Sequence, residues 1–361
     1  MKRCVNLDWL EIHCLECEDG IPRNANYFRN YYIVKARDYG TPQYREMFTL
    51  YVYDKPFLEI RRDPYSLREF GGIFEKRSCH IRLSNESCYT PHPIESLRNF
   101  LIQHKYVYKN ITRVDICMDF NHFDKGDNPQ KFLNDYLKLK YRKINQCNIA
   151  SFGKDKWDEM TWNSVHWGTT NSPVSTKFYN KSLELKERKD KLYIRQAWLD
   201  AGLDIEKVWR VEFSISSKIK DYVRTDSGEF FENTLMCYDS QEKLLYMFHC
   251  LAEKYFHFKY YEVTEDGAPK RKSRCKDKIL FYLHRDEEPV LPIQKKYIPS
   301  PDRVDKMLVK RLIEISERKD VEPTVLIAAR TLILFYRHHR KLPLWAKDWY
   351  SAYDLVLTHE R

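Results

Sequence analysis

Two aspartates lie on one face of the apolar segment ITRVDICMDF, residues 111–120. In an extended chain, side chains alternate between two faces, so Asp115, Cys117 and Asp119 share the face opposite the apolar residues. Carboxylate oxygens in this arrangement suit a hard divalent cation. A solvent-exposed strand face that carries two acids is the alternative interpretation.

A tyrosine lies between two lysines in KFYNK, residues 177–181. Lys177, Tyr179 and Lys181 share one strand face, and Glu184 follows shortly after. A free phenol has a pKa of about 10, so attack on a phosphodiester needs a nearby cation or lysine that favours the phenolate. The pattern makes Tyr179 a candidate nucleophile, with Lys181 as its candidate catalytic neighbour and Lys177 as a candidate DNA contact. Since the chain holds 26 tyrosines, an ordinary structural tyrosine is the alternative.

A third segment, VWRVEFSI at residues 208–215, places Arg210 and Glu212 together opposite its apolar face. The two could form a simple salt bridge, or they could serve as a phosphate clamp and a metal ligand. The strand-face pattern predicts that Asp115, Asp119 and Glu212 converge on one metal, with Glu184 as a fourth ligand. On the same pattern, Arg210 is a catalytic residue that could bond a phosphate oxygen directly.

The elements that would position these residues can be predicted from hydrophobic periodicity. Alternation predicts strands, and it runs over residues 9–13, 48–53, 79–84, 111–120, 161–180 and 208–214. Amphipathic patterns predict helices at 93–104, 129–138, 240–257, 302–318 and 323–339. Asp239 and Glu242 form a predicted capping box for the third helix. We expect an N-terminal α+β lobe (1–105), a catalytic α+β lobe (106–295) and a C-terminal helical region (296–361).

Composition favours an anionic partner in the cytoplasm. The net charge is +10, and the 43% of hydrophobic residues indicates a globular chain rather than a disordered one. We find no apolar run of membrane-spanning length and no secretory signal, so the ten cysteines are expected to be reduced thiols. The expected location is the bacterial cytoplasm.

A basic segment near residue 270 is a candidate arm on DNA, although a solvated loop is the alternative. Its proposed contacts are Lys270, Arg271, Lys272 and Arg274. A catalytic tyrosine and metal ligands recognise any phosphodiester, so sequence choice needs separate groups that reach base edges. We expect these in the 270–278 segment and in the C-terminal helices, whose basic end is residues 337–341.

The order of these segments resembles the replication initiation factor family, the rolling-circle initiators of small plasmids and some filamentous phages. The resemblance covers roughly residues 5–260, from the early strand NLDWLEI through HIRLSNESC. Its motifs continue in Thr112-Arg113-Val114-Asp115 with Asp119, Gly168-Thr169 with Ser172, Tyr179-Asn180-Lys181 with Glu184, and Arg210-Val211-Glu212. Two positions depart from the family pattern: Thr169 replaces a serine, and Asn180 replaces an acid.

The resemblance implies site-specific nicking of one DNA strand and its rejoining. A tyrosine would retain the 5′ end covalently, and the freed 3′ hydroxyl would prime a host polymerase. The resemblance also implies a divalent metal cofactor, Mg²⁺ or Mn²⁺. The implied partners are a host helicase, double-stranded origin DNA and single-stranded DNA, and the protein could form a homodimer. The expected fold is α+β, an antiparallel-sheet-based, HUH-like catalytic body in two related lobes with a C-terminal helical tail. The sequence lacks the His-hydrophobic-His pair of the better-known relaxases, which favours an acidic site.

Three other functions remain open from the sequence. The same chemistry would serve a relaxase or transposase of an integrative element. A non-catalytic DNA-binding regulator could retain the fold, and a basic RNA-binding protein would share the charge.

Overall fold

The computed structural model describes residues 2–16, 27–28, 32–37, 40–67, 74–144, 147–156, 159–186, 191–260, 275–281, 288–294, 301–317, 320–339 and 342. The chain forms two compact units, residues 1–295 and residues 296–361.

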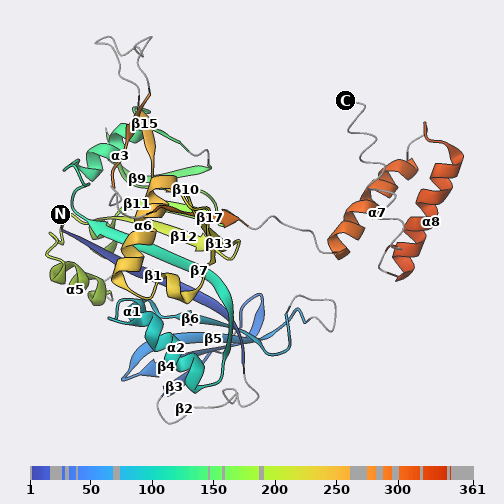
Figure 1. Ribbon diagram of the computed structural model, residues 1–361, viewed down its shortest axis with the longest axis horizontal. Helices are drawn as coiled ribbons and strands as arrows, with labels where there is room; N and C mark the ends of the chain where they lie inside the picture. Colours follow the sequence, from blue (N-terminus) through green and yellow to red (C-terminus); the bar gives the residue numbers. More distant parts are fainter. Residues whose placement is uncertain are drawn as a thin grey trace. The chain divides into compact units, whose positions relative to one another are not determined.

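An 11-stranded antiparallel sheet forms the first unit, in the order β2-β3-β4-β5-β6-β1-β7-β12-β11-β10-β9. Its strands are β1 (Arg3–Leu15), β2 (Tyr27–Phe28), β3 (Tyr32–Ala36), β4 (Tyr44–Val52), β5 (Lys55–Pro64), β6 (Ser78–Leu83), β7 (Val107–Phe120), β9 (Ile149–Lys156), β10 (Glu159–Trp167), β11 (Val174–Asn180) and β12 (Trp209–Ser216). Figure 1 shows β1 and β7 between the two halves of this sheet. The sheet therefore runs without a break through both predicted lobes.

Two small sheets and several helices complete this unit. The sheets have the orders β14-β13-β17 and β16-β15-β8, with strands β8 (Arg142–Lys143), β13 (Ile219–Arg224), β14 (Phe230–Glu232), β15 (Phe258–Tyr260), β16 (Lys276–Lys278) and β17 (Val290–Gln294). The helices are α1 (Asn85–Cys88), α2 (Pro93–Gln103), α3 (Pro129–Leu137), α4 (Lys181–Lys186), α5 (Leu192–Asp200), the short 3₁₀ helix η2 (Leu235–Cys237) and α6 (Gln241–Tyr255). The fold is α+β, as the sequence predicted.

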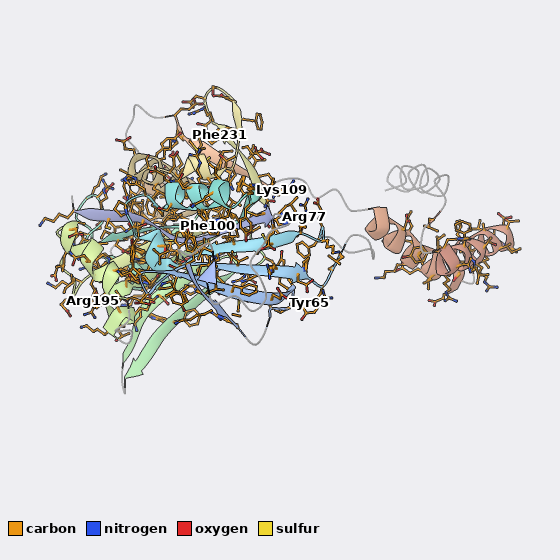
Figure 2. All side chains as sticks on the ribbon, turned by 90° about the horizontal axis from the view of Figure 1, so that it is seen from below. Tyr65, Arg77, Phe100, Lys109, Arg195 and Phe231 are labelled. Carbon is orange, nitrogen blue, oxygen red and sulfur yellow. The ribbon has the colours of Figure 1, made fainter. Side chains whose placement is uncertain are left out.

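The alternating strands bury one face of the large sheet. Ile116 of β7 and Phe213 of β12 are cross-strand neighbours on this face, and both are fully buried. Phe248 of α6 packs on Phe213 with ring centroids 5.2 Å apart, and Phe100 of α2, labelled in Figure 2, belongs to the same core. Burial of apolar surface on this side leaves the opposite face for polar side chains.

The start of helix α6 differs from the prediction. Ser240, and not Asp239, is its N-cap, because the Ser240 side chain accepts a hydrogen bond from the Lys243 backbone N–H. Asp239 instead pairs with the Lys243 side chain at 2.7 Å. Serine and aspartate are both good N-caps, so the sequence pattern alone did not choose between adjacent positions.

The second unit is a helical pair, α7 (Pro301–Glu317) and α8 (Pro323–His339), drawn in orange-red in Figure 1. Leu308 and Leu312 of α7 pack with Leu332 and Ile333 of α8 in a separate small core. Both helices match the predicted ranges closely. No helix in the described part of the chain is long and apolar enough to cross a membrane.

Candidate active site

A polar cavity of about 530 Å³ lies over β11, β12 and β7, on the face opposite the apolar core. The strand register creates it, because Lys177 is the cross-strand neighbour of Glu212, and Ser214 is the neighbour of Asp115. Lys177, Glu212, Asp115 and Tyr179 all line the cavity. The sheet thus brings together residues from three segments that are distant in sequence.

The hydroxyl of Tyr179 is held between an acid and a cation. It donates to Oε2 of Glu212 at 3.1 Å and accepts from Nζ of Lys181 at 3.3 Å. Lys177 binds the other oxygen of Glu212 at 2.7 Å. Burial and the adjacent Glu212 carboxylate raise the pKa of Tyr179 well above its usual value. The free phenol is therefore neutral, and its proton already points at an acceptor.

Lys181 is a nearly buried lysine at the first position of α4. Its ammonium binds Oε2 of Glu184 at 2.7 Å, and Lys191 approaches the other oxygen of Glu184 at 3.6 Å. Burial lowers the pKa of Lys181, and the nearby Arg210 guanidinium acts in the same direction. This lysine is thus a desolvated cation whose nitrogen contacts the tyrosine oxygen.

Asn180 caps the helix that carries Lys181. Its side-chain oxygen accepts a hydrogen bond from the backbone N–H of Leu183 at 2.9 Å, which satisfies one free donor of the first turn of α4. Asparagine and aspartate are equally good in this role. The departure from the family pattern at this position therefore leaves the local structure intact.

Arg210 and Asp119 form a buried pair beneath the cavity rather than on its wall. Both are 0% exposed, and Arg210 binds both oxygens of Asp119, through Nε at 2.6 Å and Nη2 at 2.7 Å. Trp198 of α5 also donates to Asp119, at 2.6 Å. Neither residue lines the cavity, so Asp119 lies apart from the other predicted metal ligands. The interpretation of Arg210 as a direct phosphate contact does not fit this geometry.

Asp8 is a cavity residue that the sequence analysis missed. It accepts from Nη1 of Arg210 and from the hydroxyl of Tyr89, each at 2.7 Å. Burial alone would raise its pKa, but the charges of Arg210 and Lys181 lower the pKa of Asp8 to about 2. The signal for its position was the break in β1 alternation between Leu7 and Leu10, where the register shifts.

Asp115 is bound on both oxygens by neighbouring side chains. Arg113 donates through Nε at 2.9 Å and through Nη2 at 2.5 Å, and the Ser214 hydroxyl donates as well. Burial and the nearby Glu212 raise the pKa of Asp115 to about 6 despite these contacts. Arg113 itself lines the cavity and is partly exposed there, in addition to its contact with Asp115.

The carboxylates around the cavity do not fit a divalent metal in this arrangement. Asp115, Glu184 and Glu212 are each paired with a lysine or an arginine, and Asp8 is paired with Arg210. Among the residues that the structure describes, no group of three or more His, Cys, Asp or Glu side chains could hold a metal ion.

The glycine-threonine motif and its serine, Ser172, lie outside the cavity lining. The Gly168-Thr169 turn joins β10 to β11, and Gly168 has a φ of 93°, a conformation that favours glycine. The Thr169 backbone N–H donates to the Ser172 hydroxyl at 2.9 Å, so this motif closes a turn. The predicted DNA contacts Lys270, Arg271, Lys272 and Arg274 lie outside the described residues.

Comparisons with protein-family models and with curated proteins gave no match. Among solved structures, the chain is similar to the rolling circle replication initiator protein from Geobacillus stearothermophilus. The two are 13% identical, the match covers 74% of this chain and 93% of that chain, and the TM-score is 0.44. A likeness of this size supports no inference about function.

Proposed function

We propose that this protein cuts one DNA strand by transesterification to Tyr179, and that the cut starts rolling-circle replication of a plasmid or similar element. The observation that carries the proposal is the Tyr179 hydroxyl, held in a polar cavity between the Lys181 ammonium and the Glu212 carboxylate. The motif order described above supports the biological role.

The cavity provides what attack by a phenol needs. The Tyr179 oxygen attacks the scissile phosphorus, and its proton passes to Glu212, the carboxylate that already accepts its hydrogen bond. An oxygen–phosphorus bond forms to tyrosine, the bond from phosphorus to the 3′ oxygen breaks, and the released 3′ oxygen takes a proton from solvent. The bond energy is kept in the phosphotyrosine, so the reverse reaction rejoins the strand.

Fixed cations would stabilise the charge that develops in this reaction. Lys181 contacts the attacking oxygen, and Lys177, Lys191 and Arg113 line the same cavity. Donors held in place before the reaction are worth more in a partly desolvated site than in water. Lys177 has a second role, because its contact with Oε1 of Glu212 aims Oε2 at the tyrosine.

A covalent adduct is the direct test. The purified full chain is incubated with the DNA of its own element, in parallel reactions with magnesium, with manganese and with chelator. Denaturing electrophoresis then detects protein that carries DNA, and mass spectrometry of the digested adduct locates the linked residue. We expect the link at Tyr179, to the 5′ phosphate end of the cut strand.

The matched variants are Tyr179→Phe and Tyr193→Phe. Tyr193 lies on α5 and packs on Tyr89 with ring centroids 5.2 Å apart, and the hydroxyl of Tyr89 binds the cavity residue Asp8. Each change removes one tyrosine hydroxyl. The first variant should form no adduct, and the second should form it normally. A link at Tyr193, or full replication activity of the Tyr179→Phe protein, contradicts the proposal; the latter result points to a non-catalytic DNA-binding regulator.

A further inference from the structure

A row of charged side chains crosses β5, β6, β1 and β7 beside the cavity, and its member on β7 is Arg113, the cross-strand neighbour of Glu11. Glu59 is the cross-strand neighbour of Arg82, which is the neighbour of Glu11. Both glutamates bind Arg61, Glu59 at 2.7 Å and Glu11 at 3.3 Å. Among the described residues, Arg82 forms no ion pair, although Glu59 and Glu11 lie on either side of it.

The contacts that Arg82 does make hold it at the edge of the cavity. Its guanidinium lies 3.4 Å from the ring centroid of Trp9, and its Nη2 donates to Oδ1 of Asn85 at 2.9 Å. Trp9 and Asn85 both line the cavity that contains Tyr179. Arg82 is therefore one side chain away from the proposed reaction space, on the β6 side.

Two donors in this group lack acceptors. Nε of Arg82 and Nε1 of Trp9 are buried and have no hydrogen-bond partner among the described residues. Burial lowers the pKa of Arg82, so its charge is not fully compensated by its surroundings. A buried donor without a partner costs free energy. Unlike Arg210, Arg82 is only partly buried as a whole, so the accessible part of its guanidinium is suited to an anionic oxygen from a ligand.

We propose that Arg82 binds a backbone phosphate of the substrate strand next to the scissile one, with Trp9 and Asn85 holding its guanidinium in place. This inference rests on the proposed DNA-cutting function. A planar guanidinium suits a phosphate because it offers paired donors, and stacking on an indole leaves its edge available for them. Arg82 is then a positioning residue that fixes the register of the strand over Tyr179.

Binding is measured in the Tyr179→Phe protein, so that no chemistry intervenes. The first probe is a thymidine homopolymer strand, titrated at several salt concentrations with and without Arg82→Gln. Log affinity falls as log salt rises, and loss of one phosphate contact should make this slope less steep by about 0.7. Binding should weaken about 10- to 30-fold. An unchanged slope would overturn the proposal.

The second probe is a single-stranded oligonucleotide that spans the mapped cut, with one neutral methylphosphonate placed at each position in turn. At one phosphate near the cut, neutralising the phosphate and changing Arg82 should not be additive, since both remove the same contact. Additive losses at every position would show that Arg82 acts elsewhere. If the wild-type protein forms no adduct, the salt slope still decides the question, and the proposed function fails separately.

Two further variants separate contact from folding. Arg224→Gln changes an arginine of β13 that pairs with Glu229 and should leave both slope and affinity unchanged. Arg82→Lys keeps the charge and should retain the slope while losing part of the affinity. Thermal unfolding by circular dichroism shows whether each variant is folded. A folded Arg82→Lys protein whose salt dependence is as shallow as that of Arg82→Gln also contradicts the proposal.

Discussion

The hydroxyl of Tyr179 donates its hydrogen bond to Glu212, 3.1 Å away, across adjacent strands of one antiparallel sheet. The two residues come from segments that the sequence marked for different roles, a nucleophile and a metal ligand. Their contact indicates a different role for the Glu212 carboxylate, as the acceptor of the Tyr179 proton.

Replacing Glu212 by glutamine should therefore slow adduct formation about 10²- to 10⁴-fold, because the amide keeps the shape but accepts no proton. Strand binding by the same variant should change little. The rate is measured in a single turnover with excess protein. Glu46→Gln, which removes a carboxylate paired with Arg62 on β4 and β5, is the control and should cut at the normal rate. If both variants form the adduct at the same rate, Glu212 does not accept the tyrosine proton.

Replacing Arg210 by alanine should destabilise the whole unit rather than the chemical step. The change leaves Asp119 buried without its charge partner, which costs about 3–5 kcal/mol. Urea unfolding should show this loss, and cutting and strand binding should fall together. Arg224→Ala, at a partly exposed ion pair, should cost at most about 1 kcal/mol. If the Arg210→Ala protein is stable and binds DNA normally but does not cut it, Arg210 has the direct catalytic role that the sequence predicted.

Asp8 should contribute acid-sensitive stability. Its pKa in the folded protein is about 2, below the value of about 4 in an unfolded chain, so its ionised form stabilises the fold. This contribution, on the order of 2 kcal/mol, is present above pH 4 and is lost as the pH falls towards 2. The stability difference between the wild type and Asp8→Asn should therefore narrow across that interval. Urea unfolding at several pH values measures it, and a constant difference would show that Asp8 is not linked to Arg210 in this way.

A chain that ends at residue 299 should keep cutting of a single-stranded oligonucleotide. The cavity belongs to the first compact unit, residues 1–295, and the helical pair has its own core. Duplex origin binding should weaken and become less salt-dependent, because the basic end of α8 is removed. Gel-shift titration of the two substrates measures both effects. A folded truncation that binds the duplex normally would show that α7 and α8 do not contact DNA.

Much of the secondary structure could be predicted from the sequence. Alternation identified the strands that became β7, β11 and β12, and it placed Lys177 with Tyr179 and Asp115 with Asp119 on single faces. Helices α2, α3, α6, α7 and α8 were also expected, because amphipathic periodicity and caps are local signals. Helix α5 was not expected, although it carries Trp198, which donates a hydrogen bond to the buried Asp119.

The sequence by itself determined which side chains share a face, since that depends only on the period of the extended chain. The tertiary structure decided which of them meet. Asp119 and Arg210 have the correct parity, yet α5 and Tyr89 enclose them, whereas the shift in β1 register brings Asp8 into the cavity. Burial and charge pairing depend on contacts between distant segments, and no local pattern encodes the partner of a buried charge.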